Sequence, residues 1–178
     1  MTNRKAPLFA VSCSLLAVAI NGGKRSLREI PKAALIVHDP KMCAGCGVCE
    51  VMCSLYHEGV LGPALARSHV VRQPFTAEHS RDTCQQCSSP SCYSACPLKD
   101  KAMRIDQTTG TAYVVDDGCT GCGACVDACP FDPPRISINL QKNVASKCDL
   151  CRERQAGPIC VEYCPFQALK IASKDRRG

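Results

Sequence analysis

Residues 119–130 read Cys119-Thr120-Gly121-Cys122-Gly123-Ala124-Cys125-Val126-Asp127-Ala128-Cys129-Pro130. The spacing is C-x2-C-x2-C-x3-C-P, in which three closely spaced thiolates can hold one face of an iron–sulfur cube. The fourth cysteine, followed by proline, is the type that ligates the other cluster of a two-cluster fold. Gly121 and Gly123 allow a tight backbone turn that brings amide N–H groups near the sulfur atoms. The stretch therefore predicts an iron–sulfur site.

The same arrangement recurs three more times in looser form. Sixteen of the seventeen cysteines fall into four groups, and only Cys13 is left over. The groups are Cys43, Cys46, Cys49 and Cys53; Cys84, Cys87, Cys92 and Cys96; Cys119, Cys122, Cys125 and Cys129; and Cys148, Cys151, Cys160 and Cys164. Four quartets predict four [4Fe–4S] clusters with these cysteines as iron ligands. Cys13 is predicted to be a small apolar residue and not a ligand.

Disulfides and zinc are the two alternatives for so many cysteines. A content of 17 cysteines in 178 residues also fits a disulfide-linked secreted protein. Three cysteines within seven residues, present twice, cannot all reach partners at disulfide geometry. Zinc sites use C-x2-C pairs, but zinc leaves the third cysteine of each triplet and the trailing Cys-Pro unexplained. Spacing therefore favours iron–sulfur clusters over both alternatives.

The composition agrees with a protein built around such clusters. The chain has no tryptophan, four phenylalanines and four tyrosines, so large side chains build little of a core. Clusters would supply the missing centre, and binding them would be coupled to folding. The formal charge of +6 counts neutral thiols. Four clusters, each about 2− with their thiolates, would leave the total near −2. The positive charge is therefore poor evidence for nucleic-acid binding, and we expect none.

Residues 1–33 differ from the rest of the chain. Arg4 and Lys5 precede an apolar run from Ala6 to Ile20. The run resembles a secretory signal, but Arg4-Lys5 is at best a degenerate twin-arginine motif. It is shorter than the roughly 20 residues that cross a bilayer, so no membrane span is predicted. We expect an N-terminal apolar extension that docks onto a partner subunit or a second copy of the chain. Residues 174–178 form a charged tail.

Short strands alternate with cysteine loops and short helices along the rest of the chain. The pattern predicts a helix over 50–58 and strands over 34–37, 70–72, 103–106, 112–115, 136–138, 143–145 and 168–171. This alternation predicts an α+β fold with the ferredoxin-like two-cluster unit present twice. Spacing alone does not decide which groups pair, because the linkers 96–119 and 129–148 are both short.

Over residues 34–173 the four groups resemble the four-cluster ferredoxin-type subunits of multi-subunit oxidoreductases. Examples are the iron–sulfur subunits of dimethyl sulfoxide reductase, formate dehydrogenase and hydrogenase complexes. The compact length, and Leu35-Ile36-Val37 leading into the stretch 43–49, also resemble the ferredoxin subunits that accompany tungsten-dependent aldehyde oxidoreductases. Two departures from the family pattern are Ser54 in place of proline after Cys53 and the eight-residue gap before Cys160.

The resemblance implies that the first group pairs with the fourth and the second with the third. The implied ligand sets are Cys43, Cys46 and Cys49 with Cys164; Cys148, Cys151 and Cys160 with Cys53; Cys84, Cys87 and Cys92 with Cys129; and Cys119, Cys122 and Cys125 with Cys96. The second two-cluster unit, residues 76–133, is then nested inside an outer unit of residues 34–75 and 134–173. Every ligand position is cysteine, so four cubane clusters are expected.

The resemblance implies a non-catalytic electron-transfer subunit that relays single electrons through four clusters. One partner would be a catalytic subunit, a tungsten- or molybdenum-dependent pterin enzyme such as an aldehyde oxidoreductase, and a flavin subunit would be another. Two alternatives are an electron-transfer subunit of a hydrogenase, formate dehydrogenase or dimethyl sulfoxide reductase-type complex, and a cluster-containing scaffold or filament subunit. A cytoplasmic location is expected, with export in folded form alongside a partner as the alternative.

Few other residues suggest chemistry. There is no phosphate-binding glycine loop and no dinucleotide fingerprint. A radical enzyme or dehydratase would need a cluster with an open iron, which complete quartets of cysteine argue against. The histidines are scattered, so each is expected at the surface or in a loop: His38, His57, His69 and His79. Lys99, Arg104 and Lys147 lie near cysteine groups in sequence. One hypothesis is that they raise the potentials of nearby clusters, and the simpler expectation is that they are solvated.

Overall fold

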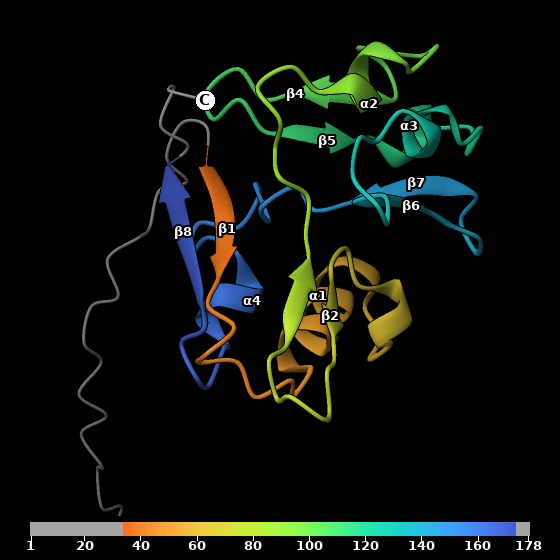
Figure 1. Ribbon diagram of the computed structural model, residues 1–178. Helices are drawn as coiled ribbons and strands as arrows, with labels where there is room; N and C mark the ends of the chain where they lie inside the picture. The colour runs from red at the N-terminus through yellow and green to blue at the C-terminus, as the bar shows by residue number, and fades with distance from the viewer. Residues whose placement is uncertain (1–33, 174–178) are drawn as a thin grey trace, which may run out of the picture.

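The structure, a computed structural model, describes residues 34–173 (Figure 1). The predicted extension of residues 1–33, Cys13 within it and the tail of residues 174–178 lie outside the described residues. The elements are β1 (Ala34–His38), α1 (Val48–Glu58), η1 (Pro63–Leu65), β2 (His69–Val71), β3 (Ser80–Asp82), α2 (Ser91–Ser94), β4 (Met103–Ile105), β5 (Ala112–Val114), η2 (Asp116–Gly118), α3 (Ala124–Asp127), β6 (Ile136–Asn139), β7 (Val144–Lys147), α4 (Ile159–Glu162) and β8 (Leu169–Ser173).

All strands of the described chain pair in twos and antiparallel. β2 pairs with β3, β4 with β5 and β6 with β7, each with its neighbour in sequence. β1 pairs instead with β8, with Ile36 opposite Ile171, so the first and last strands lie side by side (Figure 1). Alternate positions of β1, Ala34 and Ile36, are buried, because successive side chains of a strand point to opposite faces.

The helices and hairpins pack into two neighbouring groups. α1 packs against α4, and α4 in turn contacts β8 of the β1–β8 pair (Figure 1). α2 packs against α3, β6 contacts α3, and β7 contacts β5. The hairpin β6–β7, which the sequence-based division assigned to the outer unit, therefore packs on elements of the middle unit.

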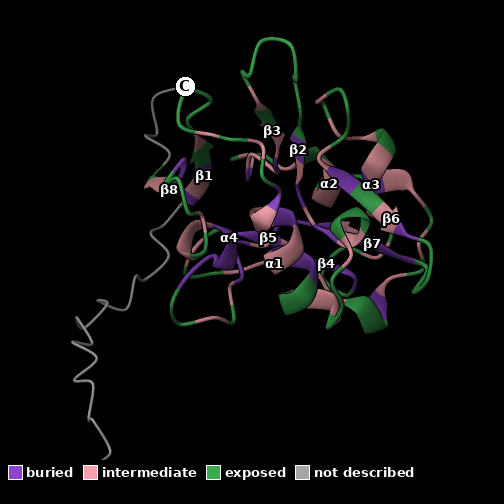
Figure 2. Cartoon of the chain, turned by 90° about the horizontal axis from the view of Figure 1, so that it is seen from below, coloured by how far each residue is buried: buried purple, intermediate pink, exposed green. Residues whose placement is uncertain are grey.

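Cysteines form part of both apolar cores. Apolar core 1 contains Ala34, Ile36, Cys148, Leu150, Cys160 and Leu169. Apolar core 2 contains Met103, Cys125, Ile136 and Ala145. Figure 2 shows the buried segments as short stretches distributed along the chain. Because so few large side chains are available, cysteine sulfur takes positions that aliphatic or aromatic groups would occupy in an ordinary domain of this size.

The structure is a small mixed α/β fold with short strands and few helices, consistent with a ferredoxin-like domain. Every predicted strand is present near its predicted position, and α1 begins two residues before the prediction of 50–58. α1 is also much longer than α2, α3 and α4. Ser54 explains its length, since a serine after Cys53 lets the helix continue where proline would interrupt it. β3 was not predicted, because Ser80, Arg81 and Asp82 contain no apolar residue to produce an alternating pattern.

Candidate iron–sulfur sites

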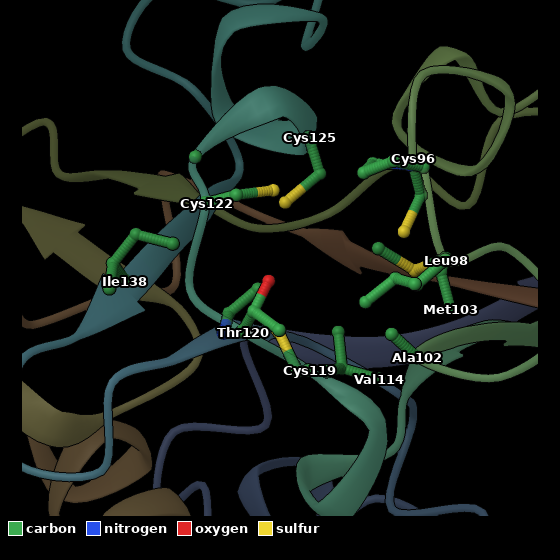
Figure 3. A pocket seen from close by; sticks show the side chains of 13 residues that line it. Cys96, Leu98, Ala102, Met103, Val114, Cys119, Thr120, Cys122, Cys125 and Ile138 are labelled. Carbon is green, nitrogen blue, oxygen red and sulfur yellow. Dashed lines mark hydrogen bonds between the residues drawn. The ribbon is translucent and has the colours of Figure 1, made fainter.

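Three pockets are each lined by four cysteines. They are site 1 with Cys43, Cys46, Cys49 and Cys164; site 3 with Cys84, Cys87, Cys92 and Cys129; and site 4 with Cys96, Cys119, Cys122 and Cys125. In each pocket three cysteines come from one sequence group and the fourth comes from another. At site 4, Cys122 and Cys125 turn their sulfur atoms toward one another, and Cys96 lies across the pocket from them (Figure 3). These are the sets that the family resemblance implies, although ligation itself stays a prediction.

The remaining predicted ligands, Cys53, Cys148, Cys151 and Cys160, are called site 2. All four are buried, with exposed fractions of 4 to 8%. Cys53 comes from α1 and Cys160 from α4, and these two helices pack together. Burial raises the pKa of Cys151 to about 12, and the charges of Asp149, Cys160 and Cys53 act in the same direction. The structure therefore brings these residues close together in the interior.

Sites 1 and 4 are built on glycine-containing loops. Gly45 and Gly121 precede the second cysteine of their groups and have φ of 64° and 66°. Gly47 and Gly123 follow that cysteine and have φ of 77° and 84°. These left-handed conformations favour glycine and confirm the tight turns predicted for Gly121 and Gly123. We refer to the loops 43–49 and 119–125 as glycine loops.

Sites 2 and 3 are built on a second type of loop, which the sequence analysis missed. The residue before the second cysteine is again left-handed, but it is Gln86, with φ of 47°, or Leu150, with φ of 60°. A proline caps the short helix that carries the third cysteine: Pro90 before α2 and Pro158 before α4. The signal that could have revealed this type is Pro-x-Cys, at 90–92 and again at 158–160. We refer to the loops 84–92 and 148–160 as proline loops.

Each site has a backbone N–H that donates to a cysteine sulfur. The donors are Gly45 to Cys43 at 3.4 Å, Arg67 to Cys53 at 3.4 Å, Gln86 to Cys84 at 3.5 Å, Arg135 to Cys129 at 3.2 Å and Ala145 to Cys119 at 3.3 Å. Hydrogen bonds to sulfur favour the thiolate and are one means by which a protein adjusts the potential of an iron–sulfur cluster. The loops are thus arranged to hold thiolates.

Without a metal centre, the thiols do not readily lose their protons in this environment. Burial raises the pKa of Cys49, Cys53 and Cys125 to about 11, and it raises that of Cys148 well above the usual value. Positive charge from a metal centre is needed to convert such thiols to thiolates near neutral pH, and loading would release their protons. Four cysteines around a pocket, with N–H donors to sulfur, fit an iron–sulfur cluster.

Charged side chains are distributed unevenly among the sites. Lys147 and Arg135 line the pocket of site 3, and Arg81 lines that of site 1. Lys147 is 2% exposed, so the expectation of a solvated lysine is wrong. Its Nζ donates to the carbonyl oxygens of Cys148, at 3.2 Å, and Ala112. Site 4 differs, because none of the residues that line its pocket is charged.

His57 contradicts the expectation that every histidine lies at the surface or in a loop. It belongs to α1, and its side chain is 8% exposed. Its Nε2 lies 3.6 Å from Asp149 Oδ1 and 3.6 Å from Cys151 Sγ. Burial lowers the pKa of His57 to about 4, with the nearby Arg67 guanidinium acting in the same direction. His57 is therefore a neutral imidazole beside a predicted ligand of site 2.

The described helices are short. The longest of them, α1, has 11 residues. Among residues 34–173 no helix combines the length and the apolar composition that a membrane crossing requires.

Four sets of four cysteines on a small mixed α/β frame define an iron–sulfur protein of the ferredoxin type. Residues 75–174 match the model of the 4Fe-4S dicluster domain, and this chain belongs to that family. The matched residues contain the second, third and fourth cysteine groups. The resemblance predicted from the cysteine spacing is therefore confirmed.

Relatives extend the match to the first group. The chain is 39% identical over 152 residues to the aliphatic sulfonate oxidoreductase, polyferredoxin-like subunit, of Pyrococcus furiosus, covering 84% of this chain and 83% of the relative. It is 36% identical to the putative electron transport protein YsaA of Escherichia coli, with coverages of 79% and 90%. It is 34% identical to the thiosulfate reductase electron transfer subunit PhsB of Salmonella typhi, with coverages of 84% and 80%. These relatives are electron-transport proteins or subunits of oxidoreductases.

Proposed function

We propose that this chain is a non-catalytic electron-transfer subunit that carries four [4Fe–4S] clusters. The observation that carries the proposal is that three pockets are each lined by four cysteines, with the four remaining described cysteines buried together at site 2. When bound, [4Fe–4S] clusters supply one-electron redox chemistry. The chain's own residues hold the clusters, exclude water from them and set the charge around them.

The ligands we assign are the sixteen cysteines of sites 1 to 4. Each unit would then combine a glycine loop with a proline loop, since site 1 belongs with site 2 and site 3 with site 4. Pairing of β1 with β8 supports an outer unit that encloses a nested middle unit. Packing of β6–β7 on α3 and β5 favours a middle unit that extends as far as Lys147.

The apolar cores support a linear order of the four sites. Cys49 of site 1 and Cys84 of site 3 both pack against apolar core 1, which contains Cys148 and Cys160 of site 2. Cys92 of site 3 packs against apolar core 2, which contains Cys125 of site 4. The order is therefore site 1, site 2, site 3, site 4.

The two ends of this series are the open ones. Of the sixteen described cysteines, the exposed ones are Cys46 at site 1 and Cys122 at site 4. Partners would exchange electrons with the chain at these two ends. The names of the relatives support a catalytic oxidoreductase subunit as one partner. Four finer points are predictions from the sequence. The catalytic partner is a tungsten or molybdenum pterin enzyme, a flavin subunit is a second partner, residues 1–33 dock onto a partner or a second copy, and the location is cytoplasmic.

Elemental and redox analysis of protein purified without oxygen tests the proposal. We expect about 16 iron atoms and about 16 acid-labile sulfides per chain. A titration followed by electron paramagnetic resonance should show four one-electron centres. An iron count near zero, or a metal content dominated by zinc, would reject the proposal. Clusters that are present but cannot be reduced would instead support a scaffold.

A further inference from the structure

Arg81 lies between two of the proposed cluster sites. It belongs to β3, opposite Val70 of β2, and its side chain lines the pocket of site 1. Burial opposes its charge, yet Cys160, Cys49 and Cys148 lie close enough that their thiolate forms raise the pKa of Arg81 above its usual value. Cys49 belongs to site 1, whereas Cys148 and Cys160 belong to site 2. The guanidinium therefore faces both sites.

The hydrogen bonding of Arg81 is incomplete. Its Nη2 donates to Ser68 Oγ at 2.6 Å. Within residues 34–173 its Nε and Nη1 atoms are buried and have no hydrogen-bond partner, although Cys160 makes a side-chain hydrogen bond with the guanidinium. Leaving buried donors of a charged group unsatisfied is strongly unfavourable. Two buried donors of a side chain that lines the pocket of site 1 are thus left unsatisfied by residues 34–173.

Arg81 also has no carboxylate partner among the described residues. Arg67 pairs with Asp149 at 3.0 Å, and Arg135 pairs with Asp82. No ion pair joins Arg81 to a carboxylate within residues 34–173. A guanidinium stays charged at any ordinary pH, so it cannot avoid the penalty of burial by losing a proton. Neutral thiols do not compensate this charge, whereas clusters with thiolate ligands, each about 2−, would do so.

We propose that Arg81 is the shared counter-charge of sites 1 and 2, where it raises the reduction potentials of both clusters and stabilises both when they are bound. The proposal rests on the ligand sets assigned above. A fixed positive charge favours the reduced, more negative form of a nearby cluster, and Nε and Nη1 supply donors for sulfur. Arg81 thus acts as a positioning and charge-compensating residue, not as a ligand.

Two substitutions that introduce side chains of similar length distinguish the effect of the charge of Arg81 from the effect of its shape. Arg81→Met removes the charge, and Arg81→Lys keeps it. Arg104→Met is the control, because Arg104 is exposed on β4 and its Nε donates to the carbonyl oxygen of Asp100 at 3.0 Å. Each full-length variant is purified without oxygen. Iron is counted, and the centres are titrated with dithionite under electron paramagnetic resonance.

In Arg81→Met the equilibrium constant for reduction of two of the four centres should fall about tenfold, which lowers their reduction potentials by about 59 mV for a one-electron couple. The other two centres should not change, Arg81→Lys should recover most of the shift, and Arg104→Met should match the wild type. If Arg81→Met loses up to half of the iron during isolation and Arg81→Lys keeps all of it, this result also supports stabilisation of the two clusters by the charge.

Two results would overturn the proposal. One is four unchanged potentials in fully loaded Arg81→Met. The other is equal iron loss in Arg81→Met and Arg81→Lys, which would show that packing and the Ser68 hydrogen bond matter and that charge does not. Neither result affects the proposed function, which fails only if the wild-type protein itself lacks four reducible clusters.

Discussion

The loops of site 4 and site 2 share a backbone conformation and differ in what surrounds it. Gly121 and Leu150 precede the second cysteine of their groups, with φ of 66° and 60°. Gly121 has no side chain, and the cysteine that follows it, Cys122, is exposed. Leu150 is 0% exposed and belongs to apolar core 1. A left-handed leucine costs about 1–2 kcal/mol, and burial of its side chain offsets that cost.

The same two sites also differ in charge. The pocket of site 4 has no charged lining residue. Site 2 has the Arg67–Asp149 ion pair beside it and faces Arg81. Equal sets of four cysteines thus lie in an open, uncharged environment at one end of the series and in a closed, charged one near its centre. We expect the glycine loop of site 4 to tolerate the loss of its cluster and the proline loop of site 2 not to tolerate it.

Removing one cysteine ligand from site 4 or from site 2 should give the largest effects. Cys122→Ala should lower the iron content from about 16 to about 12 per chain and leave the fold intact. Cys160→Ala should lower it to about 8 and cause aggregation, because Cys160 lies in apolar core 1, against which Cys49 and Cys164 of site 1 also pack. Iron analysis and size-exclusion chromatography measure both effects.

Cys13→Ala is the control for these substitutions, since Cys13 is predicted not to be a ligand. It should retain the wild-type iron content. Equal losses in Cys122→Ala and Cys160→Ala would contradict the contrast between the two sites.

Two glycines within the loop of site 4 offer a finer test. A Cβ at Gly121 would lie 2.5 Å from the backbone oxygen of Asn143, whereas a Cβ at Gly123 would have nothing within 4 Å. Both positions have positive φ, so alanine at either costs about 1–2 kcal/mol. At Gly121 the clash with backbone should add about 1–3 kcal/mol, because the neighbouring loop must move.

The rate at which the cluster absorbance bleaches at a fixed temperature measures this difference. Gly121→Ala should bleach much faster than Gly123→Ala, and Gly123→Ala slightly faster than the wild type. Similar rates in the two variants would show that strain at φ, and not contact with Asn143, controls the stability of the loop.

The sequence predicted what depends on local spacing and missed what depends on packing between distant segments. The quartets were predictable, because the thiolates that hold one cluster lie close together in sequence, as in groups whose cysteines are separated by only two or three residues. Glycine loops were predictable for the same reason, since Gly121 signals a left-handed turn. Gln86 and Leu150 adopt that turn without glycine, so no local signal marks it. The burial of Lys147 and His57 depends on contacts with segments more than 30 residues away.

The smallest effect that we predict is at Lys147, which brings positive charge to one of two neighbouring sites. It lines the pocket of site 3 and not that of site 4, although both sites pack against apolar core 2. Lys147→Met should lower the reduction equilibrium of one centre by about tenfold, or about 59 mV, because a buried positive charge no longer favours the reduced cluster.

Redox titration followed by electron paramagnetic resonance measures that shift. The signal that is missing in Cys122→Ala is that of site 4, and in Lys147→Met this signal should keep its wild-type potential. Lys170→Met is the matched control, since Lys170 is exposed on β8. An equal shift at sites 3 and 4 would mean that the charge acts over the whole middle unit. The uncharged pocket of site 4 would then not isolate its potential from that of its neighbour.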